Sequence, residues 1–318
     1  MTKQDDMTET PLVSVVISTH NRKQKLCRLL KSIMRSSYPR DRLEVIVVDD
    51  ASTDGTFEEV KNAFQDVLVI RNEKEQLLAR SRNIGILSAH SDFIFIIDDD
   101  NVIAEDTIGE LLKAMNRISN LGIAGPLMFY LADPSRVWCG RVKRNYVTSL
   151  TTFPEREKCN VKFSGILESD EFPNAFMMRR EVIEKVGMFD EVVFPIHNDE
   201  GDLCNRARMA GFKIGLVPTA RVWHDTPLPF EEHIGARRFH VHSAQRAFYC
   251  ARNRVLFHRR YSNVYEFSAF MSVFMPLVSS VYLKVILADS SSPIQERMHI
   301  AKEYLRGIIE GLTFNWRV

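Results

Sequence analysis

Short, almost wholly apolar segments rich in β-branched residues recur near the start of the chain. Three of them are Leu12–Ser18, Leu43–Val48 and Phe93–Ile97, and such runs are typical of strands that are buried on both faces of a sheet. Apolar residues at helical spacing from Leu26 to Met34 separate the first two, and a further apolar run at Val67–Ile70 follows a second helical pattern. This alternation predicts an α/β fold with a doubly wound, mostly parallel sheet.

Clusters of polar residues follow three of these segments. They are Thr19, His20, Asn21 and Arg22 after the first, Asp49, Asp50, Ala51 and Ser52 after the second, and Asp98, Asp99, Asp100 and Asn101 after the third. Ligands of a doubly wound sheet bind at the carboxyl ends of its strands, so we expect one crevice to collect all three clusters. A single carboxylate there can serve only to cap the next helix, but three clusters together favour a binding site.

The run of three aspartates is the most informative of these clusters. Adjacent carboxylates at the end of a buried strand repel one another unless a cation or hydrogen-bond donors offset their charge. Mn²⁺ or Mg²⁺ suits such oxygen ligands, and phosphate groups commonly complete the coordination. The chain contains neither a G-x-x-x-x-G-K-[ST] loop nor a G-x-G-x-x-G turn, so we expect a metal and arginines to hold any phosphates.

Composition narrows the class of protein. Hydrophobic residues make up 45% of the chain, which is enough for a globular core. The net charge of +1 gives no overall attraction to nucleic acid. The five cysteines are scattered and form no C-x-x-C pair, which fits a reducing compartment. The polar first ten residues resemble neither a secretory signal nor a transit peptide, so we expect the chemistry to take place in the cytoplasm.

Ordered motifs between Pro11 and His224 resemble those of glycosyltransferase family 2, which has an A-type nucleotide-sugar-binding fold. In chain order they are VSVVISTHNR, VVDDASTDGT, LLARSRNIGI, IIDDDN, GMFDE and NDEGDLCNRARMAGFKI. The resemblance implies an inverting enzyme that moves a sugar from a nucleoside diphosphate-sugar donor to a hydroxyl acceptor.

The resemblance also implies roles for individual residues. The donor's base would be held by Thr19, His20, Asn21, Arg22 and Asp50. Arg82 would lie beside the base and phosphates. Asp98 and Asp100 span the family's D-x-D pattern, with Asp100 the direct metal ligand and Asp99 close by. His224 resembles a family histidine that reaches the metal or the diphosphate from the far side.

Inversion needs a base on the side of the sugar opposite the leaving group. In the family this base comes from a Glu-Asp pair shortly before an Asp-Leu, whereas this chain has Asp199-Glu200 before Asp202-Leu203. Alignment by position favours Glu200 as the base, and alignment by residue type favours Asp199. Asp202, in the first turn of the expected helix, is assigned a structural role.

A basic segment without a single acidic residue runs from His233 to Tyr265. It contains seven arginines, namely Arg237, Arg238, Arg246, Arg252, Arg254, Arg259 and Arg260. Aromatic residues between them suggest an amphipathic helix that lies on an anionic membrane surface or grips phosphate. We expect no nucleic-acid partner, because no recognition module accompanies the segment.

The next segment, Phe267–Leu283, is uncharged over seventeen residues and contains Pro276. As a helix it would reach roughly 26 Å, just short of a hydrocarbon core of about 30 Å. Its serines and proline favour a broken or re-entrant interfacial hairpin, with a pair of buried core helices as the alternative. The tail Ile294–Gly311 has an amphipathic pattern, so we expect it to fold back onto the basic segment.

Together these observations predict a polar tail over residues 1–10, a glycosyltransferase A-type catalytic domain over 11–228, and a basic and apolar helical membrane-associating region over 229–318. The expected activity is metal-dependent transfer to a lipid-linked glycan or cell-surface polysaccharide precursor at the cytoplasmic face of the cell membrane, with a cytoplasmic location as the alternative. Two other functions stay open. The reversed Asp199-Glu200 order allows a degenerate protein that only binds sugar nucleotides, and a sugar nucleotidyltransferase would also use metal-binding aspartates, although no lysine-bearing phosphate loop follows the first strand.

Overall fold

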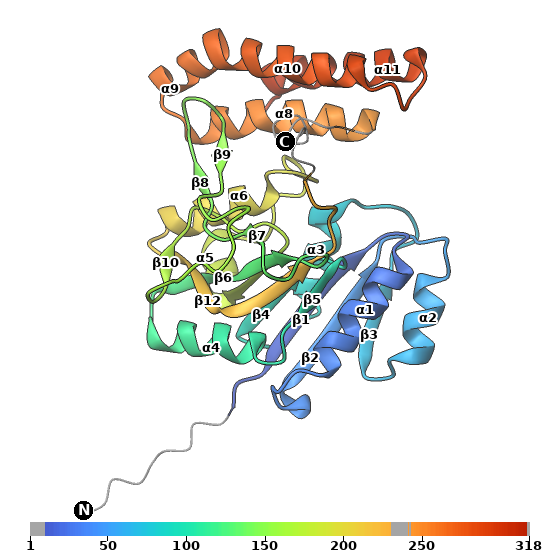
Figure 1. The fold of residues 1–318 in the computed structure, drawn as a ribbon, viewed down its shortest axis with the longest axis vertical. Helices are drawn as coiled ribbons and strands as arrows, with labels where there is room; N and C mark the ends of the chain where they lie inside the picture. Colours follow the sequence, from blue (N-terminus) through green and yellow to red (C-terminus); the bar gives the residue numbers. More distant parts are fainter. Residues whose placement is uncertain (1–9, 230–240, 242, 317–318) are drawn as a thin grey trace, which may run out of the picture.

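The apolar segments of the N-terminal third form the parallel half of one large sheet (Figure 1). The computed structural model describes residues 10–229, 241 and 243–316. Four parallel strands are neighbours in the order β4-β1-β2-β3, namely β1 (Val13–Thr19), β2 (Leu43–Asp49), β3 (Val67–Arg71) and β4 (Phe93–Ile97). The predicted α/β fold with a mostly parallel sheet is confirmed.

The second half of the sheet mixes strand directions. β11 (Ala175–Arg179) is antiparallel to β4 and to β6 (Leu121–Tyr130), and β12 (Lys213–His224) is parallel to β6. The remaining strands are short: β5 (Asn101–Ile103) and β10 (Leu167–Glu168) pair with β12, β7 (Val137–Cys139) pairs with β6, and β8 (Lys143–Arg144) pairs with β9 (Thr151–Thr152).

Helices cover both faces of the sheet, as expected for a doubly wound fold. One face carries α1 (Lys23–Met34), α2 (Thr56–Ala63) and α4 (Thr107–Arg117), and the other carries α3 (Leu78–Leu87), α5 (Arg180–Val186) and α6 (Asp199–Met209). Successive side chains of a strand point to opposite faces. Accordingly Val15 packs in one core cluster with Leu29 of α1, and Val16 packs in the other with Ile86 of α3.

Strand β12 is longer than the apolar run at its start. That run ends at Val217, but β12 continues past Pro218 to His224, with a shift in its register against β6 between Val217 and Arg221. Its last residue, His224, pairs with Asn101 of the antiparallel strand β5. Because Asn101 directly follows the three aspartates, this pairing brings His224 to the end of β4.

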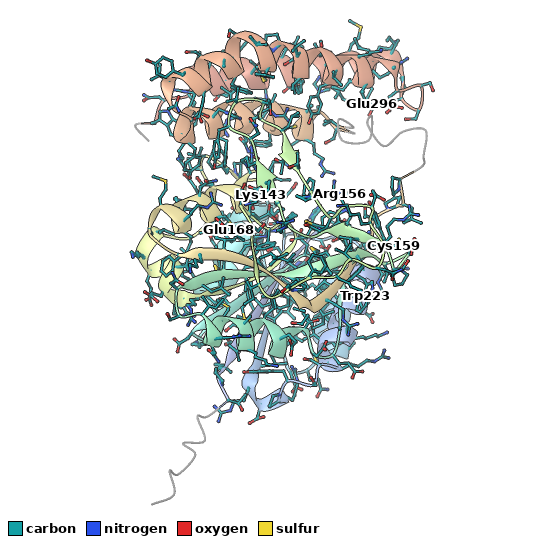
Figure 2. All side chains as sticks on the ribbon, turned by 60° about the vertical axis from the view of Figure 1, so that its left-hand side comes forward. Lys143, Arg156, Cys159, Glu168, Trp223 and Glu296 are labelled. Atoms are coloured by element: carbon teal, nitrogen blue, oxygen red, sulfur yellow. The ribbon has the colours of Figure 1, made fainter. Side chains whose placement is uncertain are left out.

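The C-terminal part of the chain forms a separate helical layer above the sheet (Figure 1), and the layer is distinct in a second view as well (Figure 2). It contains α8 (Ala244–Tyr261), α9 (Val264–Ala269), a π-helical turn (Phe270–Phe274), α10 (Met275–Ala288) and α11 (Ile294–Thr313). The tail does fold back as predicted, because α11 packs along α8. Gly307 and Gly311 of α11 lie directly against the α8 backbone, where a Cβ atom would clash.

The predicted hairpin within Phe267–Leu283 is wrong. The chain is helical from Val264 to Ala288, and Pro276 lies in the first turn of α10. A proline ring clashes with the carbonyl four residues earlier in a regular helix, and the wider π-helical turn directly before α10 relieves that clash. Among the described residues this is the one helical run long and apolar enough to cross a membrane, and 33% of its most apolar window is buried.

The arginines of the basic segment have partners inside the protein. Arg260 contacts Asp190 and Asp202, Arg254 donates to the Tyr282 hydroxyl, and Arg252 and Arg259 donate to backbone carbonyls. Arg260 thus has anionic partners inside the protein, which the sequence did not indicate. The carbonyl and hydroxyl groups that the other three contact are neutral, so an anionic partner for the basic segment stays a prediction. Arg246 is exposed, and Arg237 and Arg238 lie outside the described residues.

Candidate active site

The ends of β1 and β4 are joined by hydrogen bonds between the first and third polar clusters. Thr19 Oγ1 donates to Asp99 Oδ2 at 2.6 Å, and Arg22 Nη1 lies 3.0 Å from both Asp99 Oδ1 and Asp100 Oδ2. Asp99 is buried, whereas the Arg22 side chain is about half exposed. Arg22 therefore supplies the positive charge at the entrance to the aspartates.

The second polar cluster is tied to the first through Asn21. The backbone N–H of Asn21 donates to Ser52 Oγ at 2.8 Å, and the side-chain Oδ1 of Asn21 accepts from the backbone N–H of Thr53 at 2.8 Å. Asn21 and Ala51 both have positive φ, +53° and +59°, a conformation that non-glycine residues adopt rarely and mostly at functional sites. His20 Nδ1 donates to the Asp50 carbonyl at 2.6 Å. All three clusters therefore meet at one edge of the sheet.

Asp50 occupies a buried position at this edge. Its Oδ1 accepts hydrogen bonds from Asn72 Nδ2 at 2.7 Å and from the Gln76 N–H at 2.8 Å. These two donors come from the segment between β3 and α3, and the sequence analysis did not identify them. They fix the direction of the Asp50 carboxylate. The family resemblance implies that this carboxylate binds the nucleoside base of the donor.

Asp100 and His224 form the best candidate pair of metal ligands. Asp100 Oδ1 lies 3.4 Å from His224 Nε2 and is buried without a hydrogen-bond partner among the described residues. Neighbouring ligands of an octahedral Mg²⁺ ion are about 3 Å apart, given bond lengths of about 2.1 Å. No group of three or more His, Cys, Asp or Glu residues in the described part of the chain could hold a metal. A bound ion would therefore take its other ligands from substrate phosphate or water.

Neighbouring charges set the ionisation of the two aspartates differently. Burial raises the pKa of Asp99 to about 6 despite its contacts with Arg22 and Thr19. Burial acts in the same direction on Asp100, but the nearby His224 ring and the charges of Arg22 and Lys25 outweigh it, so the pKa of Asp100 is lowered. Asp100 is therefore the carboxylate prepared to bind a cation.

A second cluster surrounds the buried side chain of Arg82 on α3. Its Nη1 lies 2.6 Å from Asp199 Oδ2, and its Nη2 lies 2.6 Å from Asp98 Oδ1 and 3.0 Å from Glu200 Oε1. The resemblance implied that Arg82 lies beside the base and phosphates and that Asp98 is a metal ligand. In the structure these two residues bind each other and link the end of β4 to the first turn of α6.

One guanidinium faces three carboxylates in this cluster. Burial alone would lower the pKa of Arg82, but Asp98, Glu200 and Asp199 raise it above its ordinary value. Burial and the nearby Asp199 charge raise the pKa of Glu200 to about 8. The Asp199 side chain is 1% exposed and that of Glu200 is 18% exposed. Of the two candidate bases, Glu200 is therefore the one that solvent or an acceptor can reach.

Asn174 connects the two clusters, and it lies in the segment Phe172–Met177, which resembles the family's acceptor-side floor beneath the donor sugar. Its backbone N–H donates to Glu200 Oε1 at 3.3 Å, and its Nδ2 lies 3.0 Å from His224 Nε2. Asn174 has a φ of +66°, which asparagine tolerates better than most residues. The Trp138 ring is tilted against the His224 ring, with centroids 4.2 Å apart. No local pattern marks Trp138, because the pairing of β7 with β6 brings it here.

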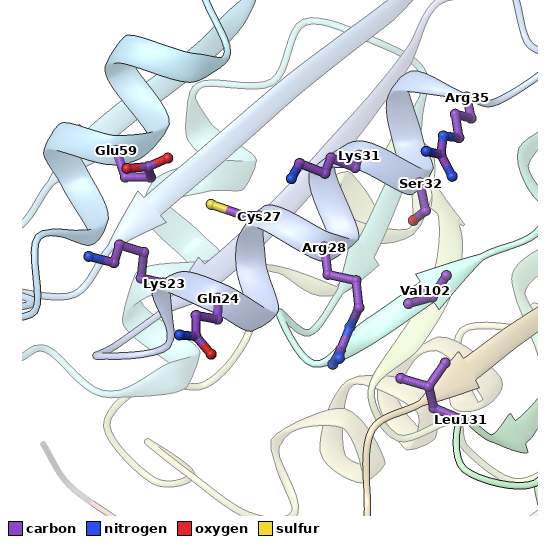
Figure 3. Close-up of a pocket in the computed structure, with 10 residues that line it drawn as sticks. All are labelled: Lys23, Gln24, Cys27, Arg28, Lys31, Ser32, Arg35, Glu59, Val102 and Leu131. Carbon is purple, nitrogen blue, oxygen red and sulfur yellow. The ribbon is translucent and has the colours of Figure 1, made fainter.

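A hollow of about 610 Å³ lies beside α1 (Figure 3). Its lining includes Lys23, Arg28 and Lys31 on α1, and Glu59 on α2. It contains none of the strand-end aspartates. The candidate active site is therefore identified by the polar side chains that meet at the strand ends, and not by the volume of a cavity.

Comparison with known proteins gives consistent matches. The family model described as Glycosyl transferase family 2 matches residues 14–187. The probable glycosyltransferase YdaM of Bacillus subtilis is 25% identical over 240 residues, which is 70% of this chain and 53% of YdaM. The poly(ribitol-phosphate) beta-N-acetylglucosaminyltransferase TarS of Staphylococcus aureus is 28% identical over 99 residues, 30% of this chain and 17% of TarS. The chain thus spans about half or less of these curated relatives.

A solved structure shares the fold. The mannosyltransferase PcManGT from Pyrobaculum calidifontis, in complex with GDP-Man and Mn²⁺, superposes with a TM-score of 0.58 at 17% identity, covering 96% of this chain and 88% of that one. This likeness confirms the glycosyltransferase A-type fold that the motifs implied.

The raised pKa of Glu200 predicts a pH-dependent effect on stability. Between the ordinary glutamate pKa of about 4.3 and about 8, the folded protein retains a proton that the unfolded chain has lost, so the free energy of unfolding falls as the pH rises. Glu200→Gln removes the ionisable group, and with it this pH-dependent fall in the free energy of unfolding. We expect its melting temperature to rise relative to the unsubstituted protein from about pH 5 to about pH 9, by about 2–4 °C per kcal/mol.

Thermal unfolding followed by circular dichroism at several pH values measures this effect. Glu184→Gln, at an exposed position on α5, is the matched control and should give no such trend. A difference between Glu200→Gln and the native protein that stays constant over the whole pH range would contradict the buried, protonated state of Glu200.

Proposed function

Because this chain belongs to glycosyl transferase family 2, we propose that it transfers a sugar, with inversion, from a nucleoside diphosphate-sugar to a hydroxyl acceptor. The observation that carries the proposal is the position of Asn174, which contacts both Glu200 and His224. A candidate base and a candidate metal ligand thus lie on either side of one residue. A sugar held between them would have its diphosphate on one side and its acceptor on the other.

In this proposal the first two polar clusters bind the nucleoside. Asp50, held by Asn72 and Gln76, and His20, held by the Asp50 carbonyl, lie at the base end. Thr19 and Asn21 fix the loop after β1. Arg22, at the entrance to the aspartates, is placed to contact the diphosphate. Its partly exposed guanidinium can move from Asp99 and Asp100 to a phosphate oxygen at little cost.

We assign the metal to Asp100 and His224, with Asp99 supporting the site through Arg22 and Thr19. Mn²⁺ or Mg²⁺ bound there would stabilise the negative charge that develops on the leaving diphosphate. Asp98 is not assigned as a ligand, because its carboxylate binds Arg82.

Glu200 is our proposed general base. It would take the proton of the acceptor hydroxyl on its carboxylate while that oxygen attacks the anomeric carbon. A pKa near the operating pH favours this role, and its contacts with Arg82 and Asn174 hold one carboxylate oxygen in place. Asp199 is buried against Arg82 and serves to position it.

We further propose that the protein acts on a lipid-linked glycan or polysaccharide precursor at the cytoplasmic face of a membrane. Large apolar side chains are exposed along the helical layer, among them Val273, Leu277, Val281 and Leu287 on the run from Val264 to Ala288, and Leu305, Ile309 and Leu312 on α11. Exposed apolar surface of this extent marks an interaction site. The apolar surface, more than the arginines, supports the membrane proposal.

The metal assignment predicts metal-dependent binding of the nucleotide. Calorimetry should give at least ~10-fold tighter binding of a nucleoside diphosphate with Mn²⁺ or Mg²⁺ than with EDTA, and Asp100→Asn should abolish this difference. Asp106→Asn, at a half-exposed carboxylate, is the control and should retain it. Equal affinity with and without the metal would exclude the assignment.

The assignment of the base predicts a loss of transfer without a loss of donor binding. Glu200→Gln should lower the turnover number by ~10²-fold and leave the donor affinity almost unchanged. If Asp199→Asn has this effect and Glu200→Gln does not, the base is Asp199. Donor binding without any release of nucleoside diphosphate by the native protein would favour a binding protein, and pyrophosphate exchange would favour a nucleotidyltransferase.

The membrane proposal predicts binding to vesicles. The protein should co-sediment with anionic liposomes, and Leu277→Lys should reduce the bound fraction ~10-fold, because burial of one leucine is worth about 1.5–3 kcal/mol. Leu68→Lys, at an exposed leucine of β3, is the control. Full solubility without detergent, together with no liposome binding at low salt, would refute the proposal.

A further inference from the structure

The segment that leads to Glu200 is not stabilised by regular secondary structure. Residues 190–198 form neither helix nor strand. The last two, His197 and Asn198, have φ values of +64° and +62°, which are strained for non-glycine residues. Asn198 is the N-cap of α6 and makes no side-chain capping hydrogen bond. Contacts from elsewhere must therefore hold Glu200 at the start of α6.

Helix α8 of the helical layer supplies donors to this segment. Asn253 Nδ2 donates to the carbonyls of Ile196 and His197, at 2.6 and 3.1 Å. Arg252 Nη1 donates to the carbonyl of Val193 at 2.8 Å. The Asn253 and Arg252 side chains are both buried, where a carbonyl left without a partner would be costly. The Ala79 N–H of α3 also donates to the Pro195 carbonyl at 3.0 Å, and Arg144 Nη2 of β8 donates to Asn198 Oδ1 at 3.4 Å. Helix α8 thus supplies a large share, but not all, of the contacts that hold the segment before α6.

Arg260, the last residue but one of α8, contacts the same loop at both ends. Its Nη1 lies 2.7 Å from Asp202 Oδ1 on α6, and its Nη2 lies 2.8 Å from Asp190 Oδ2. The Tyr261 hydroxyl also donates to Asp202 Oδ1, at 2.5 Å. A guanidinium has two parallel donor nitrogens in a fixed plane, so Arg260 joins the first residue of the loop to the first turn of the helix that carries Glu200.

Apolar contacts support these polar ones. Phe194, inside the loop, is fully buried against Leu256 and Phe257 of α8. The Phe194 and Phe257 rings meet edge to face, with centroids 6.2 Å apart. This small core is separate from the two clusters that stabilise the sheet. The loop therefore packs on the helical layer as well as on its own domain.

We propose that Arg260 and Asn253 of α8 are positioning residues that hold Glu200 in its reactive orientation. Neither residue belongs to the donor site, and both act through the segment before α6. This inference rests on the proposed role of Glu200 as the base. It makes the C-terminal helical layer a part of the catalytic machinery in addition to a surface for docking.

A double-mutant comparison tests the proposal in the full chain. Arg260→Lys retains the charge beside Asp202 but cannot bridge both acids, so we expect the turnover number to fall ~10-fold with the donor affinity within ~2-fold of the native value. In a Glu200→Gln background the same substitution should change the residual transfer by less than ~2-fold, because the group that it positions is already gone. Asn253→Leu should behave like Arg260→Lys.

Arg259→Lys is the matched control. Arg259 is the preceding residue on α8, and its guanidinium also lies over the Trp316 ring, but it donates to the carbonyls of Gly311 and Phe314 instead of to Asp190 and Asp202. It should leave turnover within ~2-fold of native. An equal loss for Arg259→Lys and Arg260→Lys, or an equal loss from Arg260→Lys with and without Glu200→Gln, would overturn the proposal, because a general structural effect lowers every background alike.

Hydrogen exchange separates this inference from the proposed function. The amides of residues 193–203 should exchange faster in Arg260→Lys and Asn253→Leu than in the native protein, and not in Arg259→Lys. This readout needs no transfer activity. Unchanged exchange in both variants would refute the positioning role, whereas faster exchange in a protein that transfers no sugar would refute the proposed function alone.

Discussion

The ion cluster around Arg82 is the interaction on which the site depends. A buried cation with three carboxylates is costly to desolvate, and loss of its central charge would leave buried anions unpaired at a cost of about 3–5 kcal/mol. The cluster joins α3, the end of β4 and the first turn of α6. Since α6 lies far along the chain from α3 and β4, with 117 positions between Arg82 and Asp199, the cluster fixes the distance between the strand-end aspartates and Glu200. Its surplus of negative charge also explains why Glu200 retains a proton so readily.

Much of the fold could be predicted because the parallel strands are apolar on both faces and lie near one another in sequence. The three polar clusters at the ends of β1, β2 and β4 followed from that topology. The family resemblance identified His224, but the sequence did not indicate how the residue reaches the site. Strand β12, which carries it there, extends through Pro218 and has no continuous apolar pattern. Trp138 reaches the site through the antiparallel pairing of β7 with β6, which no local sequence signal records. Asn174 lies in a segment that resembles the family, but the resemblance did not give its contacts with Glu200 and His224.

The sequence could not decide between Asp199 and Glu200, because the difference lies in burial. Both residues occupy the first turn of α6, but helical geometry turns Asp199 inward to Arg82 and leaves Glu200 at the surface of the cluster. The same limit applied to the basic segment. The basic segment that contains Arg260 has no acidic residue in its sequence, but the fold brings Asp190 and Asp202 into contact with Arg260. The positive charge of Arg260 is therefore paired in the folded protein, and its ion pairs connect α8 to the loop before α6 and to α6 itself.

The bridge from Arg22 to Asp99 and Asp100 gives the free protein a counter-ion of its own. Because the guanidinium is tethered to the loop after β1, it neutralises the aspartates without being lost to solvent. In the proposed function a metal ion would replace this arginine at the aspartates, and the displaced guanidinium would be free to contact the phosphates of the donor. The net charge of the pocket would change little during loading, so the carboxylates need not become bare at any stage. A resident arginine of this kind would also make premature capture of a free metal ion unfavourable, and would couple metal binding to the arrival of the nucleotide.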